Sequence, residues 1–230
     1  MKAQRLRFRY RVTEVGCSLG QRELMRAWEQ AVTDAGLCLA YSEGKRKSAQ
    51  VSVAAPLPQN VTSGGELVEV YLSEAVAPEH ALEAVPRHLP PGVEAIAVEE
   101  VGVQAPSLQS QLRWAEYEVE LPADVDEGRV REAVDMLMSA RTWPAEYRRE
   151  TRVREYDLRP LVLELKLEGS REGRVVLAMR LRAEPEMTGR ADQVVMALGL
   201  PEAAHIHRRG LYVTEVQAAV VAYRRAGEEE

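Results

Sequence analysis

Alternating apolar and polar residues open the chain and predict a strand. Between Arg5 and Val12 every second residue is apolar, so the apolar side chains share one face of a sheet and the arginines share the other. Over residues 22–35 the apolar positions instead recur at helical spacing, and Gly36 follows as a C-cap residue. We therefore expect a half-buried strand and then an amphipathic helix.

Turn residues and short apolar runs divide the rest of the first half. The elements expected are strand pieces at 37–41 and 50–54, a strand at 66–72, a helix at 78–89 and a strand at 93–98. Together with the first strand and helix, they give the order β-α-β-β-α-β over residues 1–101. This order is typical of a ferredoxin-like domain.

The second half predicts the same order of elements. It contains an alternating strand at 116–121, a helix at 126–140, strands at 161–167 and 175–181 around a glycine turn, a helix from Thr188 and a strand at 203–213. The predicted fold class is therefore α+β, with two tandem ferredoxin-like domains. We expect domain 1 at 1–101, a linker at 102–113, and domain 2 at 114–230 with a C-terminal tail, in which residues 216–225 fit a strand or a helix.

Composition limits the broad class of protein. The chain has 230 residues, 46% of them hydrophobic and 29% charged, with a formal net charge of −6, which is typical of a folded globular protein. It has no signal-peptide pattern and no apolar run of about 18 to 20 residues, so we expect a cytoplasmic protein without a membrane partner. Cys17 and Cys38 fit a reducing compartment.

The common catalytic and cofactor motifs give no support for an enzyme. The phosphate-binding, dinucleotide, serine-hydrolase and zinc-protease patterns are missing from the sequence. His205 and His207 share one face of a predicted strand, but they lack a further ligand nearby in sequence, and two neighbouring arginines repel a cation. We expect no cofactor and no metal.

The arginine face of the first strand is the most conspicuous charged feature, formed by Arg5, Arg7, Arg9 and Arg11. Residues on one face of a strand lie about 7 Å apart, a spacing comparable to that of successive phosphates, so nucleic-acid binding is one interpretation. The alternatives are simple solvation or neutralisation by acids on neighbouring strands, for which the candidates are Glu66, Glu69 and Glu94.

Two further basic clusters have the same two interpretations. One is formed by Lys45, Arg46 and Lys47, and the other by Arg148, Arg149, Arg152 and Arg154. Either cluster suits phosphate binding, but short charge runs are more often solvated loops. We expect the lysine-rich cluster to join the first arginines in binding RNA.

Five segments resemble a known family in the same order along the chain: 23–31, 35–44, 51–58, 105–108 (Ala-Pro-Ser-Leu) and 156–162 (Tyr-Asp-Leu-Arg-Pro-Leu-Val). The family is the radical SAM-linked proteins, a bacterial domain of unknown function. Its members are fused to, or encoded beside, a radical SAM protein with a cobalamin-binding region, often near genes for a ribonuclease and ribosomal proteins. The resemblance implies an accessory or RNA-linked role. The chain itself lacks the cysteine triad of radical SAM chemistry, since it has two cysteines.

The sequence departs from this family at two motifs. Residues 20–23 read Gly-Gln-Arg-Glu where the family has serine, histidine, leucine and aspartate, and Lys45 to Lys47 replace phenylalanine, asparagine and proline. If those motifs form the family's working site, the resemblance implies a divergent or inactive member.

These observations predict a non-catalytic accessory protein that binds RNA or a radical SAM partner protein. The less favoured alternative is an RNA-modifying enzyme with its site between the two halves. The candidate residues for that chemistry are Glu23, Tyr41, Asp157 and Arg159.

Overall fold

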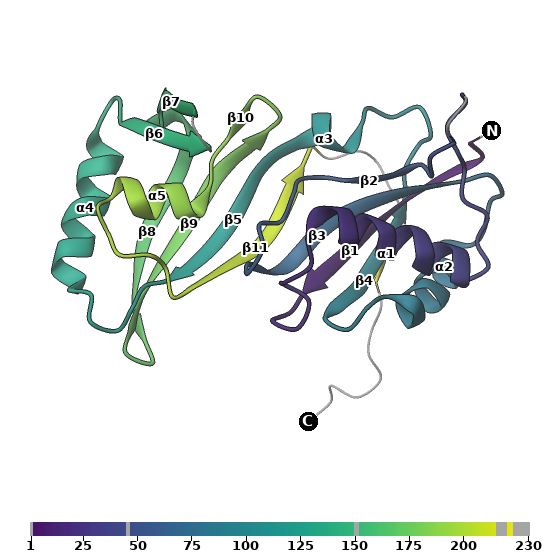
Figure 1. Cartoon of the computed structure of the whole chain (residues 1–230), viewed down its shortest axis with the longest axis horizontal. Coiled ribbons are helices and arrows are strands. Elements are labelled where there is room, and N and C mark those ends of the chain that lie inside the picture. Colours follow the sequence, from purple (N-terminus) through teal and green to yellow (C-terminus); the bar gives the residue numbers. More distant parts are fainter. Residues whose placement is uncertain (1, 45–46, 150–151, 215–219, 223–230) are drawn as a thin grey trace. The chain divides into compact units, whose positions relative to one another are not determined.

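The protein forms two compact units in a computed structural model that describes residues 2–44, 47–149, 152–214 and 220–222 (Figure 1). Unit 1 comprises Met1–Gln111 and Val213–Glu230, and unit 2 comprises Leu112–Tyr212. Each unit combines helices with an antiparallel sheet, so the predicted α+β class is confirmed.

Unit 1 follows the predicted order of elements. These are β1 (Gln4–Val12), α1 (Gln21–Asp34), β2 (Val51–Val53), β3 (Thr62–Leu72), α2 (Pro78–Ala84) with the 3-10 helix η1 (Val85–His88), β4 (Val93–Glu100) and α3 (Leu108–Gln111). The strands lie in the order β2-β3-β1-β4, and the short β12 (Val220–Ala222) pairs with β4. Every one of these pairs is antiparallel.

The core of unit 1 joins the apolar face of β1 to α1. Phe8 and Tyr10 contact the Trp28 ring of α1, with ring centroids 5.3 and 5.2 Å apart, and all three side chains are buried. Leu24 and Val32 continue the buried stripe of α1. Burial of apolar side chains of this size stabilises a fold by about 1.5–3 kcal/mol each. The apolar face of the strand β1 and the apolar stripe of the helix α1 therefore form one core.

Unit 2 contains β5 (Leu112–Glu120), α4 (Glu127–Ser139), β6 (Pro144–Arg149), β7 (Arg152–Asp157), the 3-10 helix η2 (Arg159–Leu161), β8 (Val162–Arg171), β9 (Arg174–Glu184), β10 (Met187–Thr188), α5 (Ala191–Ala197) and β11 (His205–Val213). The strand order is β8-β9-β5-β11, and β10 pairs with the end of β9. Strands β6 and β7 form a separate two-stranded ribbon.

The predicted glycine turn between two strands of unit 2 is present. Arg171 pairs with Arg174, so Glu172 and Gly173 form a two-residue hairpin turn, and both have positive φ angles of 51° and 79°. Type I′ turns require this backbone conformation, which glycine adopts without strain.

Three stretches differ from the sequence expectations. Residues 37–41 make two isolated bridges, Leu39 to Leu72 and Tyr41 to Ala49, in place of a strand. The expected linker contains α3, and the side chain of Gln111 at its end is buried. The β6–β7 ribbon lies where the sequence suggested a solvated basic loop. Of residues 216–225, only 220–222 are described, and they form a strand.

No helix within the described ranges has both the length and the apolar character that a membrane span requires.

Candidate nucleic-acid interface

The structure buries two of the four arginines that the sequence assigned to nucleic-acid binding. Arg5 and Arg7 are 0% and 3% exposed. Glu69 on β3 accepts hydrogen bonds from both side chains, at 2.8 Å from the Nε of Arg5 and 2.9 Å from the Nε of Arg7. The expectation of an exposed arginine row is therefore corrected at these two positions, because neighbouring strands supply the neutralising acids.

The segment that follows β4 covers these arginines. Arg5 donates hydrogen bonds to the carbonyl oxygens of Ala105 and Pro106, at 2.7 and 2.8 Å. Arg7 donates to the Gln111 side chain at 2.9 Å and to Glu99 at 3.1 Å. This segment, 102–111, is thus fixed to the sheet of unit 1, on the face that carries the arginines.

The remaining basic residues of unit 1 are more accessible. Arg9 is half-buried, while Arg11 forms a partly exposed ion pair with Glu94 at 2.6 Å. Lys47 is exposed. Lys45 and Arg46 lie outside the described residues.

The four candidates for the alternative enzymatic site belong to different units, Glu23 and Tyr41 to unit 1 and Asp157 and Arg159 to unit 2. Glu23 accepts a hydrogen bond from the Gly20 amide at 2.8 Å and so caps α1. Tyr41 is 50% exposed.

Asp157 and Arg159 support the turn after β7. Asp157 Oδ1 accepts hydrogen bonds from the amides of Trp143 and Arg159, at 2.7 and 3.0 Å. The Arg159 guanidinium donates to the carbonyl oxygen of Val162 at 2.7 Å. These contacts give both residues a role in local structure.

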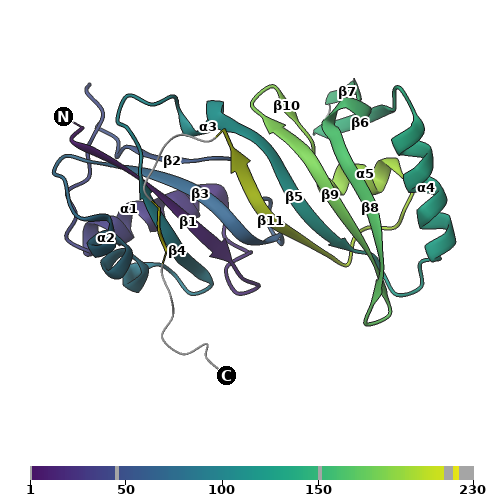
Figure 2. The same ribbon diagram turned by 180° about the vertical axis from the view of Figure 1, so that it is seen from behind.

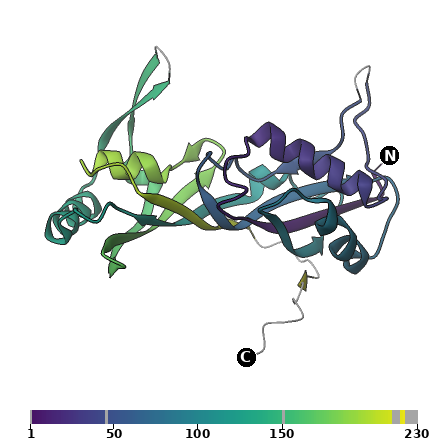
Figure 3. The same ribbon diagram turned by 60° about the horizontal axis from the view of Figure 1, so that its bottom comes forward.

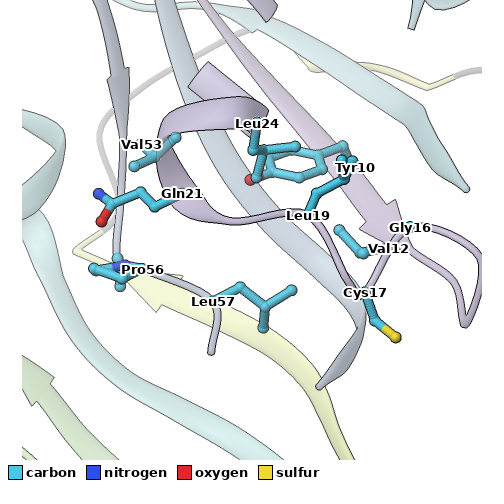
Figure 4. A pocket seen from close by; sticks show the side chains of 11 residues that line it. Tyr10, Val12, Gly16, Cys17, Leu19, Gln21, Leu24, Val53, Pro56 and Leu57 are labelled. Carbon is cyan, nitrogen blue, oxygen red and sulfur yellow. The ribbon is translucent and has the colours of Figure 1, made fainter. Parts of the chain in front are cut away.

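A small pocket lies between β1, the start of α1 and the segment after β2 (Figure 4). It has room for about one water molecule, and aliphatic groups such as Leu24 and Val53 form much of its wall. The Cys17 thiol at its edge donates a hydrogen bond to the Glu14 carbonyl at 3.1 Å. Its size does not suit a cofactor or an organic substrate.

The two histidines weighed as metal ligands lie close together on β11. The ring centroids of His205 and His207 are 6.4 Å apart. Within the part of the chain that the structure describes, no three His, Cys, Asp or Glu side chains are grouped to hold a metal ion.

A different surface, on the polar face of the unit 2 sheet, was missed by the sequence analysis. Trp114 on β5 stacks on Tyr212 of β11, with ring centroids 5.3 Å apart and an angle of 14° between the ring planes. The Arg180 guanidinium of β9 lies 5.8 Å from the centroid of a Trp114 ring. We call these three residues the aromatic platform.

The aromatic platform is accessible from solvent. Tyr212 is 37% exposed, and Trp114 and Arg180 are half-buried. Figures 1 and 2 show that α5 lies on one side of this sheet, in front of β8 and β9 in the first view and behind them in the second. The sequence did contain a signal for this surface. Trp114 alternates with the glutamates of β5 and so lies on the polar face of that strand, and Tyr212 is a second aromatic residue on β11.

Ion pairs surround the platform. Glu116 accepts hydrogen bonds from Arg180 at 3.0 Å and from the Tyr212 hydroxyl at 2.9 Å. Further along the same strand, Glu118 bridges Arg171 and Arg209, at 2.6 Å each. Burial raises the pKa of Glu118, but the hydrogen bonds from Arg209 and Arg171 outweigh that effect and hold its pKa below the ordinary value.

This geometry suits stacking of a flat, electron-rich ring beside cations held at fixed positions. Aromatic side chains on an open sheet stack on nucleic-acid bases in a sequence-tolerant way. The paired glutamates keep the arginines in place and lower the net positive charge of this face. The arrangement therefore suits the flat face of a base better than a bare phosphate.

Three solved structures are similar to parts of the chain. A chain of a Cbf5–Nop10–Gar1 complex shares 13% identity over 87% of this chain and 48% of its own length, with a TM-score of 0.47. The H/ACA RNP bound to a substrate RNA containing 2′-deoxyuridine shares 13% over 87% and 46%, with a TM-score of 0.41. An archaeal box H/ACA sRNP Nop10–Cbf5 complex shares 15% over 80% and 42%, with a TM-score of 0.35. The chain thus spans less than half the length of these matched chains.

Comparison with curated proteins gave no match. A bacterial family described as "Uncharacterized protein conserved in bacteria (DUF2344)" matches residues 5–191, which is most of the sequence. The match includes β1 with its buried arginines, the 102–111 segment and the β6–β7 ribbon. The chain therefore belongs to this bacterial family, DUF2344.

Proposed function

We propose that this chain is a non-catalytic accessory protein that binds single-stranded RNA on the polar sheet face of unit 2. One observation carries the proposal: Trp114 stacks on the exposed Tyr212 with the Arg180 guanidinium beside it. Stacking of a base on an aromatic side chain contributes about 1–3 kcal/mol. A stacked pair of large rings that is partly open to solvent on an otherwise charged face favours a ligand.

The order of elements in each unit supports a finer description of the fold. We propose that both units are ferredoxin-like modules, because each has the order β-α-β-β-α-β and places its first and third strands at the centre of the sheet. Single-stranded RNA is often bound on the open sheet of such modules. The expected domain boundaries, with domain 1 at 1–101, a linker and domain 2 at 114–230, stay a prediction.

A radical SAM partner is the second part of the proposal. It is supported by the resemblance of the 105–108 and 156–162 segments to radical SAM-linked proteins, and it concerns the protein with which the RNA-binding accessory would work. Affinity purification of the tagged chain from its host, followed by identification of co-purified protein, tests this part. Recovery of RNA without a radical SAM protein would contradict it.

Fluorescence anisotropy with a labelled single-stranded RNA of about 20 nucleotides, longer than typical single-strand sites, tests RNA binding. We expect Tyr212→Ala to weaken binding by about 5- to 150-fold, the range that loss of one stacked base predicts. Tyr41→Ala removes an exposed tyrosine of unit 1 and is the matched control. Equal affinities for these two variants, or absence of binding to the wild-type chain at low salt, would overturn the proposal.

A further inference from the structure

The turn of the β8–β9 hairpin carries two arginines in directly opposite positions. Arg171 ends β8 and Arg174 begins β9, and the two residues pair across the turn. Both side chains are exposed, at 57% and 48%. Like charges in directly opposite positions destabilise a strand pair, so the two cations do not serve the stability of the turn. In Figure 3 the hairpin extends away from α5 and from the β6–β7 ribbon.

Both arginines lie over the polar face of the unit 2 sheet. Arg171 Nη1 donates to Glu118 Oε1 at 2.6 Å, and Arg174 Nη1 donates to Glu120 Oε2 at 2.9 Å. Glu118 and Glu120 alternate with the buried residues of β5. They therefore share a face with Trp114, which begins the same alternation and belongs to the aromatic platform.

A third arginine on this face comes from β11. Arg209 Nη2 donates to Glu118 at 2.6 Å and to Glu168 of β8 at 3.1 Å. Strand β9 lies between β5 and β8, and its residue opposite Glu118 is Ala178. A small side chain at this point lets Arg209 reach across β9 to the next strand. We give the name arginine group to Arg171, Arg174 and Arg209.

Each guanidinium of the arginine group has donors left for a ligand. A guanidinium carries five N–H donors in a planar fork. Among the described residues, Arg171 and Arg174 each donate through Nη1 alone, and Arg209 donates through Nη2 alone. Arg209 is also accessible, at 41% exposure. Phosphate oxygens accept two parallel N–H bonds from such a fork, which makes a phosphate group a suitable ligand.

The glutamates fix where the guanidiniums lie. Glu118 accepts from two of the three, and Glu120 and Glu168 accept from the others. A side chain that is already held in place loses less conformational freedom when it binds. Because the group has as many acids as arginines, it attracts distant anions weakly, and its contacts act at short range. It therefore suits a phosphate that another contact brings near.

The aromatic platform supplies that other contact at a fitting distance. Glu118 and Glu120 follow Trp114 by four and six residues on β5. This separation corresponds to about 13 and 20 Å along an extended strand. Single-strand sites on OB-folds cover about 4–16 nucleotides, which is long enough for both contacts. A strand with one base on the platform thus reaches the arginine group within a few nucleotides.

We infer that the arginine group binds the phosphate backbone of the RNA strand whose base stacks on the aromatic platform. The inference rests on the proposed RNA-binding function and adds a path for the strand, along β5 from the platform to the β8–β9 turn. Stacking fixes one base, and the guanidinium forks then bind phosphates farther along the strand.

Salt titrations with a labelled single-stranded RNA of about 20 nucleotides test the inference. Arg171→Gln/Arg174→Gln removes two phosphate contacts. We expect binding at low salt to weaken by at least about tenfold, and the slope of log affinity against log salt to become shallower by about 1.4. Arg171→Lys/Arg174→Lys keeps both charges and should retain most of the wild-type slope. Arg129→Gln/Arg131→Gln removes the same charge from exposed positions of α4 and is the matched control.

The remaining outcomes separate this inference from the proposed function. An unchanged slope in the hairpin glutamine variant, or an equal change in the α4 control, overturns the inference. So does a lysine variant with a slope as shallow as that of the glutamine variant, and so does competition by polyglutamate as effective as that by unlabelled RNA. Loss of binding in Tyr212→Ala without any effect of Arg171→Gln/Arg174→Gln leaves the proposed function standing and overturns this inference. Absence of RNA binding to the wild-type chain overturns both.

Discussion

Glu69 Oε2 accepts two hydrogen bonds from the Arg5 guanidinium, at 2.8 Å from Nε and 2.5 Å from Nη2, and both side chains are shielded from solvent. The other oxygen of the same carboxylate accepts from Arg7. One carboxylate thus pairs with two cations inside the protein, and Glu99 supplies a second negative charge beside Arg7.

Removing the charge of Glu69 should destabilise unit 1 strongly. Glu69→Gln keeps the shape of the side chain but leaves two buried guanidiniums short of a counter-charge, and breaking a buried pair costs about 3–5 kcal/mol. Urea unfolding of the full chain measures the change in the free energy of unfolding. Glu94→Gln is the control, because its pair with Arg11 is partly exposed and should contribute about 0–1 kcal/mol. Equal effects of the two substitutions would contradict the role of the buried network.

Asp157 should stabilise the base of the ribbon. Asp157→Ala removes the acceptor for the amides of Trp143 and Arg159, and each hydrogen bond to a charged group contributes about 1.5–3 kcal/mol. Because Asp157 is exposed, water compensates for part of this loss. Faster hydrogen exchange at the two amides is the expected result, with Asp135→Ala on the exposed side of α4 as the control. Unchanged exchange at both amides would show that Asp157 does not hold the base.

RNA binding at the aromatic platform should depend on stacking rather than on the release of counterions. Tyr212→Ala should weaken binding at every salt concentration and leave the slope of log affinity against log salt unchanged, since stacking releases no counterions. Titrations of the wild-type chain and Tyr212→Ala at several salt concentrations measure the two slopes, and a clearly shallower slope for the variant would contradict the assignment.

Lowering the pH should reduce the contribution of Glu118, on the polar sheet face of unit 2, to the stability of the folded chain. Hydrogen bonds from Arg209 and Arg171 lower the pKa of Glu118 in the folded chain against the opposing effect of burial. A lowered folded-state pKa contributes stability above the ordinary value of 4.5, and that contribution is lost as the pH falls through the lower folded-state value. Thermal unfolding at a series of pH values should show a flatter acid limb for Glu118→Gln than for the wild type. An unchanged limb, matching that of the exposed control Glu132→Gln, would contradict this prediction.

The pattern of apolar and polar residues was sufficient to predict most helices and strands of the fold. Period-two alternation in β1, β5 and β9 and helical spacing in α1 and α4 are local properties, so they predicted strand and helix near the observed bounds. The ribbon was missed because its strands alternate charges and tyrosines rather than apolar and polar residues. Its pairing depends on the turn and on the anchored base, which periodicity alone does not reveal.

The candidate sites were less predictable because exposure is a tertiary property. The family resemblance drew attention to residues 105–108 and 156–162, and in the structure these provide carbonyl acceptors for Arg5 and an anchor for the ribbon. Trp114 and Tyr212 are 98 residues apart in numbering, and no local pattern joins them. Their stacking depends on how β5 and β11 lie in one sheet.

The sequence by itself determined the α+β class, the order of the main elements of unit 1 and the arginine face of β1, because side-chain periodicity follows directly from backbone geometry. Only the tertiary structure decided that Arg5 and Arg7 are internal. Their partners, Glu69 and the carbonyl groups of the 102–111 segment, lie 62 to 101 residues away along the chain. An isolated strand exposes its charged face to water, whereas the folded unit covers Arg5 and Arg7 with acids and backbone acceptors.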